Sequence, residues 1–168
     1  VVIGIAASGI TPYTLGALQA ANELGALTIG ISNNPDTPIL QNVAHAILAE
    51  TGSEIIAGST RMKAGTTQKA ILNIFSTALM TRLGRVYKGL MVDMAVSNNK
   101  LEKRAINMIC DIAACSEETA RDALEKADRH IKMAVLISHG ETVAGSKEIL
   151  ARADGNLRTA LSLLKSEK

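Results

Sequence analysis

Short apolar runs alternate with helical patterns over the first third of the chain. Continuous apolar runs that are typical of buried strands lie at 1–5, 27–32 and 45–49. Between the first two runs, apolar residues recur every three or four positions over 11–24, which predicts a helix ending at Gly25. A shorter helix is expected over 39–43. This alternation predicts an α/β fold with a parallel sheet covered by helices.

The rest of the chain has mainly helical patterns. A polar loop at 50–60 precedes an expected long helix over 61–83. The apolar stripe of that helix, with helical spacing, consists of Ile71, Ile74, Phe75, Ala78 and Leu79. The stretch 87–96 is ambiguous and could form a final strand. The later helices, which we expect to pack as a small bundle, lie at 98–113, from Ser116, at 130–138, 141–153 and 157–164.

The loop between the first apolar run and the first helix is rich in small residues. Ala6-Ala7-Ser8-Gly9 leads into Thr11, which can cap the helix, and Pro12, which suits its first position. Small residues permit a tight turn, and the free amides of a helix start attract anions such as phosphate. An ordinary capped turn is the alternative. The glycine spacing fits neither a dinucleotide fingerprint nor a P-loop, so one phosphate on a small molecule fits better than a nucleotide.

Charge is distributed unevenly along the chain. Residues 1–60 contain four acidic residues and no Lys or Arg, so they carry −4. The remaining residues hold all 18 basic and 12 acidic side chains and carry +6. A phosphate at Ser8 would therefore be held mainly by amides and hydroxyls, and Arg61 is the first cation available to it.

A second polar cluster follows the third apolar run, at the end of the strands where open α/β sheets bind ligands. It contains Glu54, Ser59, Arg61 and Lys63. A carboxylate beside two cations remains ionised and can accept hydroxyl protons. Because cations at a helix start oppose the helix dipole, these two could face an anion; exposure to solvent is the alternative.

Composition excludes several classes of function. A net charge of +2 and 2% aromatic residues argue against nucleic-acid binding. No apolar run approaches 18 residues, so we expect no membrane span. The first residues lack the basic region of a secretory signal, and the chain starts within a strand, as a fragment would.

Other reactive side chains have plain structural interpretations. Cys110 and Cys115 have no accompanying His or second Cys pair, so we expect reduced, buried thiols rather than a metal site. His45 is expected to be structural. Asp93 lies in an apolar stretch and is expected to pair with Lys or Arg from a neighbouring helix. The asparagines at 33–34 could meet a ligand or simply form a turn.

Several motifs together resemble the N-acetylmuramic acid 6-phosphate etherases, a family of sugar isomerase (SIS) domain proteins. They are Ala-Ala-Ser-Gly-x-Thr-Pro-Tyr at 6–13, Gly-Ser-Thr-Arg-Met-Lys-Ala-Gly-Thr at 58–66, Leu-Met-Val-Asp at 90–93, Asn98 and Lys-Leu at 100–101. The second motif is highly specific, and the resemblance covers essentially the whole chain. It implies an SIS-type α/β sandwich, lacking its first strand-loop unit, at 1–112, and a small helical domain at 113–168.

The resemblance also implies an activity. Such enzymes cleave the D-lactyl ether of N-acetylmuramic acid 6-phosphate to N-acetylglucosamine 6-phosphate and D-lactate, by elimination and then hydration. The reaction belongs to peptidoglycan recycling in the cytoplasm. It implies no metal or other cofactor, a phosphosugar as the small-molecule ligand, and a homodimer with its site at the subunit interface.

The resemblance assigns roles residue by residue. Ser8, Gly9 and Thr11 match the phosphosugar loop, and Glu54 and Ser59 match sugar-lining positions of related isomerases. The expected substrate-binding residues are thus Ser8, Gly9, Thr11, Glu54, Ser59, Arg61 and Lys63. The family's two catalytic glutamates match positions upstream of this chain, which therefore corresponds to a C-terminal portion and is expected to be inactive alone.

Two other functions remain open at this point. The glucokinase regulatory protein resembles the same family and senses phosphosugars without catalysis, although the helical tail offers no obvious partner surface. A phosphosugar isomerase is a third possibility, but the motif at 58–66 matches the etherases better.

Overall fold

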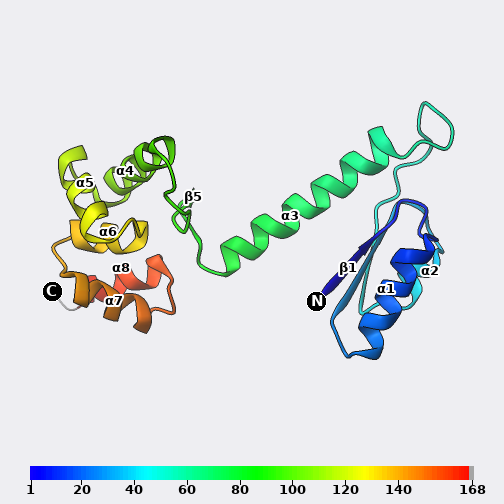
Figure 1. Ribbon diagram of the computed structural model, residues 1–168, viewed down its shortest axis with the longest axis horizontal. Coiled ribbons are helices and arrows are strands. Elements are labelled where there is room, and N and C mark those ends of the chain that lie inside the picture. Colours follow the sequence, from blue (N-terminus) through cyan, green and yellow to red (C-terminus); the bar gives the residue numbers. More distant parts are fainter. Residues whose placement is uncertain (167–168) are drawn as a thin grey trace. The chain divides into compact units, whose positions relative to one another are not determined.

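The computed structural model describes residues 1–166 and divides the chain into two compact units (Figure 1). Unit 1 comprises Val1–Ser76 and unit 2 comprises Thr77–Lys168. Helix α3, Thr66–Arg82, crosses the division between them. An α/β region with a parallel sheet, followed by helices, confirms the predicted fold class.

Unit 1 is built on a parallel sheet of three strands. β1 (Val2–Ile5), β2 (Thr28–Ser32) and β3 (His45–Leu48) pair in the order β1-β2-β3. The register places Ile3 opposite Ile29, and Ile29 opposite His45. All five residues of β2 are buried, as predicted. β3, an edge strand, is mostly exposed, contrary to prediction.

Helices α1 (Pro12–Glu23) and α2 (Pro38–Gln41) pack on one face of this sheet. Gly4 and Gly30 are paired in the register, and both lie beneath these helices. A Cβ on Gly4 would come within 2.5 Å of Leu18, and one on Gly30 would collide with the carbonyl oxygen of Ile39. The two glycines therefore allow the helices to approach the sheet closely.

The opposite face of the sheet carries isoleucines. Side chains alternate along a strand, so five isoleucines share this face with His45: Ile3, Ile5, Ile29, Ile31 and Ile47. The helix-covered side has a small core of Ala6, Leu18 and Ile39. The helices thus cover one face rather than two.

The long helix predicted over 61–83 forms, but its start and its packing differ from expectation. Residues Arg61–Gly65 form a π-helical turn, η1, that continues directly into α3. None of the residues of α3 is buried. Ile74 in the predicted stripe is 69% exposed and Phe75 is 43% exposed. The stripe has helical spacing, but none of its residues is buried.

The ambiguous stretch before the helical tail forms a hairpin in unit 2, not a further strand of the parallel sheet. β4 (Val86–Tyr87) and β5 (Leu90–Met91) pair antiparallel. The two residues between them have positive φ, +47° at Lys88 and +81° at Gly89. This conformation gives the tight turn of a two-residue hairpin loop.

Five helices complete unit 2, as the pattern predicts. They are α4 (Asn99–Ala113), α5 (Glu117–Lys126), α6 (Ile131–Ser138), α7 (Val143–Arg152) and α8 (Leu157–Ser166). The predicted caps form: the Asn98 side chain accepts the Leu101 amide at 3.0 Å, and Ser116 Oγ accepts the Thr119 amide at 3.2 Å. The boundary expected after residue 112 falls at the end of α4, inside unit 2.

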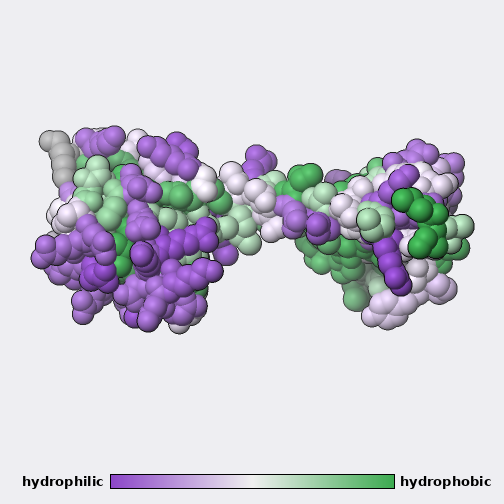
Figure 2. Space-filling model, turned by 90° about the horizontal axis from the view of Figure 1, so that it is seen from above, coloured by the Kyte–Doolittle hydropathy of each residue, from purple (hydrophilic) through white to green (hydrophobic). Residues whose placement is uncertain are grey.

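Helix α6 is central in unit 2. It packs against α4, α5 and α7 (Figure 1). Ala134, Val135 and Leu136 on this helix are fully buried. The face of unit 2 that Figure 2 shows is largely hydrophilic. Among residues 1–166, every helix is too short or too polar to span a bilayer.

Candidate functional site

The loop that follows β1 needs a glycine at position 9. Gly9 has φ +68°. A Cβ there would collide with the Thr37 side chain and lie 2.8 Å from Ser32 Oγ. The Gly9 carbonyl accepts the Ile39 amide at 3.2 Å, which fixes the loop against α2. Gly9 therefore keeps the chain tight between the ends of two strands.

The hydroxyls of this loop are exposed at the start of α1. Thr11 occupies the N-cap position before Pro12, but its side chain makes no capping hydrogen bond, contrary to the expectation that it caps. Ser8 Oγ accepts only a long bond, 3.5 Å, from the Ile10 amide. Both hydroxyls are thus available at a helix start whose amides lack a side-chain partner, an arrangement that suits an anion.

Polar side chains at the end of β2 tie the neighbouring strand ends together. The Asn34 side-chain amide donates to the Ala7 carbonyl at 2.8 Å, and the Asn33 side-chain amide donates to the Ala49 carbonyl at 2.8 Å. Gln68 at the start of α3 donates to Asn33 Oδ1 at 2.7 Å. The two asparagines therefore act as structural ties, whether or not they also meet a ligand.

A cavity of about 340 Å³ opens at this edge of the sheet. It brings together three of the predicted site residues, Ser8, Glu54 and Ser59. Its other lining residues are Ala7, Asn33, Asn34, Thr51, Gly52, Ser53, Ala57, Gly58, Thr60 and Ala64. Gly9, Thr11, Arg61 and Lys63 do not line it. The cavity is therefore polar and lies where an open α/β sheet binds ligands.

Glu54 is held by the backbone of the π-helical turn. Its Oε1 accepts the amides of Lys63 at 2.9 Å and Ala64 at 3.2 Å. These two hydrogen bonds fix the Glu54 side chain against the turn. Its second oxygen has no partner among residues 1–166, so it can accept a hydrogen bond from a ligand hydroxyl.

The two predicted cations belong to the π-helical turn that binds this carboxylate. Lys63 Nζ donates to the Ser53 carbonyl at 2.7 Å, which closes the loop on itself. The Arg61 side chain has no partner among residues 1–166, and the residue is exposed. Cations at a helix start interact unfavourably with the helix dipole. The negative charge of Glu54, which is bound to the same turn, offsets this interaction.

Sequence reasoning did not single out several hydroxyls at this edge. Thr51, Ser53 and Thr60 line the cavity, and Thr37 Oγ1 lies 3.2 Å from Ser32 Oγ beneath the loop. The polar composition of 50–60 was the available signal for the first three. Nothing in the linear pattern indicated that Gln68 would bond to Asn33.

The remaining candidate residues lie outside this cavity. Asp93 pairs with Arg85 at 3.3 Å and with Lys132 of α6 at 3.1 Å, which confirms the expected ion pairing. His45 is exposed at the start of β3. Cys110 and Cys115 are half-buried free thiols, and burial, followed by the nearby Cys115, raises the pKa of Cys110. No group of three or more potential metal-ligating side chains occurs within residues 1–166.

Comparison with known proteins supports the resemblance seen in the motifs. Residues 88–153 match the family of the C-terminal lid domain of glucokinase regulatory protein. Curated relatives named N-acetylmuramic acid 6-phosphate etherase match nearly the whole chain. The relative from Bacillus licheniformis is 46% identical over 163 residues, which is 96% of this chain and 54% of the relative.

Two further relatives give the same result. The etherase from Vibrio campbellii is 45% identical over 96% of this chain and 53% of its own length. The etherase from Symbiobacterium thermophilum is 50% identical over 81% of this chain and 45% of its own length. The chain therefore spans about half the length of the curated relatives it matches.

Proposed function

Since this chain is similar to the N-acetylmuramic acid 6-phosphate etherases over nearly its whole length, we propose that it supplies phosphosugar binding in a protein with that activity. The observation that carries the proposal is the cavity at the strand ends. There Ser8, Glu54 and Ser59 converge beside an uncapped helix start. The ligand class, a phosphosugar, is taken from the name of these relatives.

In this proposal the phosphate binds at the loop after β1. Backbone amides around Gly9 and the hydroxyls of Ser8 and Thr11 donate to the phosphate oxygens. Glu54 accepts a sugar hydroxyl through its free oxygen, and Ser59 lies on the same wall. Arg61 and Lys63 make the local potential more positive without a direct ion pair, which suits a ligand that must also leave.

The proposed reaction removes the C2 proton and expels D-lactate, and water then adds to the unsaturated intermediate. It requires a base and an acid. Glu54 is held in place by two amides, so we assign it to substrate binding and not to proton transfer. We place the catalytic carboxylates outside this chain, and we place the complete protein in cytoplasmic peptidoglycan recycling as a homodimer with the site at the subunit interface.

A phosphosugar-sensing regulator is the second candidate. The match of 88–153 to the lid domain of glucokinase regulatory protein favours it. Such a regulator would use the same phosphate loop but would turn over no substrate. The two candidates therefore differ in chemistry and not in the ligand.

The test is release of D-lactate. The complete protein, incubated with N-acetylmuramic acid 6-phosphate, should release D-lactate in equimolar amount with N-acetylglucosamine 6-phosphate, measured with a coupled lactate dehydrogenase. The 168-residue chain alone should release none. Binding of the phosphosugar by the complete protein without any lactate would favour the regulator, and absence of both would contradict the proposal.

A further inference from the structure

Unit 2 contains a second and larger cavity, of about 610 Å³. Its walls come from two segments, 92–96 after the hairpin and 128–133 at the junction of α5 and α6. Much of the lining is apolar and includes Val92, Val96, Ile131, Met133 and Leu150. This size is in the range of small-molecule sites, which are mostly apolar with a few placed polar groups.

A largely buried lysine is one of those polar groups. The Lys132 side chain is only 12% exposed. Its Nζ lies 3.1 Å from Asp93 Oδ1 and donates to the Gly155 carbonyl at 2.8 Å. An ammonium group that is mostly withdrawn from water is costly, so its contacts fix it in place at the cavity wall.

The carboxylate that holds Lys132 is shared with a second cation. Arg85 Nε lies 3.3 Å from Asp93 Oδ2, so one negative group faces two positive ones. Lys132, Arg85 and Asp93 all line the cavity. With Arg129, the wall holds three cationic side chains against two carboxylates, Asp93 and Asp128. Asp128, also a lining residue, is exposed and has no partner among residues 1–166.

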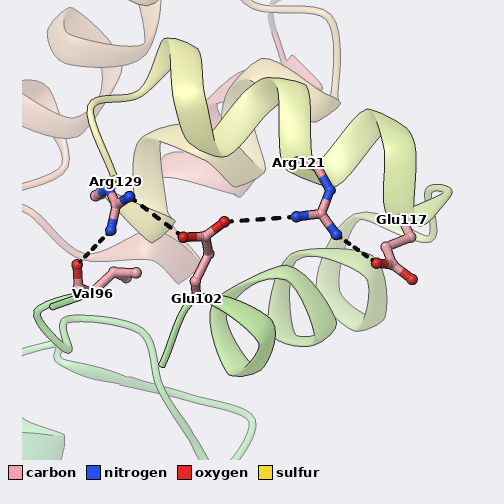
Figure 3. Close-up of polar contacts among 5 residues, drawn as sticks. All are labelled: Val96, Glu102, Glu117, Arg121 and Arg129. Atoms are coloured by element: carbon pink, nitrogen blue, oxygen red, sulfur yellow. Dashed lines mark hydrogen bonds and ion pairs between the residues drawn. The ribbon is translucent and has the colours of Figure 1, made fainter. Parts of the chain in front are cut away.

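A third cation is fixed at the same cavity by a chain of ion pairs (Figure 3). Arg129 Nη1 donates to the Val96 carbonyl at 3.2 Å, which ties the two walls together. Its Nη2 lies 3.4 Å from Glu102 on α4, and Glu102 also pairs with Arg121 at 3.6 Å. These contacts hold Arg129 in a backbone conformation of φ +64°, which is unfavourable for a residue with a side chain.

The first turn of α6 forms part of the same wall. Ile131 and Met133 line the cavity, and the N-cap residue His130 makes no side-chain capping bond. Backbone amides at a helix start add positive potential. These amides reinforce the positive potential of Lys132, which lies in the same turn.

We propose that this cavity binds a small anion with an apolar body, a phosphate monoester or a free carboxylate rather than a bare sugar phosphate. The anionic group is held at Lys132 and Arg85, and the apolar body packs against Val96, Met133 and Leu150. The site is separate from the cavity of unit 1, and its existence does not depend on the proposed etherase activity.

The experiment uses phenyl phosphate as the probe. The uniformly ¹⁵N-labelled 168-residue chain is titrated with phenyl phosphate, inorganic phosphate or phenol, and amide shifts are followed by NMR. Phenyl phosphate should shift the amides of 92–96 and 129–133 with saturation, and should bind at least about tenfold more tightly than phosphate or phenol, because both parts of the ligand contribute.

Two variants should change the affinity in opposite directions. Lys132→Met keeps the length of the side chain and removes its charge, so binding should weaken about tenfold. Asp93→Asn keeps the volume and frees two cations from their shared carboxylate, so binding should tighten about threefold. Lys103→Met, on the exposed surface of α4, is the matched control and should leave the affinity unchanged.

Several outcomes would overturn the proposal. Shifts confined to unit 1 would place the probe elsewhere. Equal affinity for phenyl phosphate and either fragment would exclude the assigned ligand class. Because Lys132→Met could lower stability, Asp93→Asn is decisive: if this variant retains the wild-type amide spectrum but binds no more tightly, the charge argument fails.

Discussion

Unit 2 encloses its apolar residues, whereas unit 1 exposes many of its own. The core of unit 2 is one continuous cluster that includes Ile109, Ala134 and Leu136, all fully buried. Unit 1 has a buried cluster of three residues beside the buried strand β2, and no residue of α3, which continues into unit 2, is buried. The space-filling view agrees: the visible face of unit 2 is mainly hydrophilic, and more apolar surface is visible on unit 1 (Figure 2).

The two units differ in how far their regular apolar patterns lead to burial. In unit 2 the apolar positions of successive short helices meet one another, so the pattern and the packing agree. In unit 1 the pattern is equally regular, but the helices that pack closely on the sheet are α1 and α2, and no residue of α3 is buried. The candidate phosphosugar site lies on this less enclosed unit.

The largest effect should come from truncating the core of unit 2. Leu136→Ala should lower the free energy of unfolding by about 2–5 kcal/mol, because it leaves a cavity in a fully buried position. Ile74→Ala on α3, where the side chain is 69% exposed, should cost less than about 1 kcal/mol. Urea unfolding followed by circular dichroism measures both, and equal losses would show that the α3 stripe is buried in solution.

A smaller loss is expected from the sheet glycines of unit 1. Gly30→Ala should destabilise unit 1 by about 1–3 kcal/mol, because the new Cβ meets the backbone carbonyl of Ile39. Gly16→Ala, on α1 with open space around it, should instead stabilise by about 0.5–1 kcal/mol. Thermal unfolding should show opposite shifts, and two shifts of the same sign would contradict the close packing of α2.

The core of unit 2 contains one polar atom whose removal should help. Ser146 Oγ is buried without a hydrogen-bond partner within residues 1–166. Ser146→Ala should raise stability by about 1 kcal/mol, because an unsatisfied buried hydroxyl is lost. Ser116→Ala, which removes the α5 cap, should lower it by a similar amount. Destabilisation by Ser146→Ala in a calorimetric scan would mean that the hydroxyl does find a partner.

Kinetics can test whether the phosphosugar site belongs to unit 1. In the complete protein, Ser8→Ala should raise KM for N-acetylmuramic acid 6-phosphate about fivefold, since one hydrogen bond of about 1 kcal/mol to a charged oxygen is lost. Ser162→Ala on the exposed side of α8 is the matched control in unit 2 and should leave KM unchanged. Equal KM values for all three proteins would remove the loop from the site.

The smallest effect is expected at Lys63. Its ammonium already bonds to the Ser53 carbonyl, so Lys63→Met should raise KM only about twofold through the loss of local positive potential. This increase should diminish at high salt, because screening weakens an exposed charge. An increase of more than tenfold that salt does not change would instead indicate direct contact between Lys63 and the phosphate.

Much of the fold was predictable because local signals and packing coincide. Gly25 ends α1 with φ +70°, Asn98 and Ser116 cap their helices, and the parallel strands appear as continuous apolar runs. The burial of α3 was not predictable in the same way. Helical spacing shows that apolar residues share one face, but it does not say what covers that face.

The site was predictable in composition and less so in geometry. Ser8, Glu54 and Ser59 do reach one cavity, because the strand ends bring separate loops together. The tie from Gln68 to Asn33 joins residues that are 35 positions apart, which no local pattern reveals. The hairpin turn at Lys88 was missed because a lysine with positive φ carries no turn signal of its own.

The π-helical turn at Arg61–Gly65 also has a consequence for the phase of α3. Relative to an α-helix, such a turn contains one additional residue. The turn accommodates this residue within a single turn, so α3 continues with nearly the phase that a regular helix one residue shorter would have. Gln68 therefore still reaches Asn33 Oδ1, at 2.7 Å, although the segment is one residue longer.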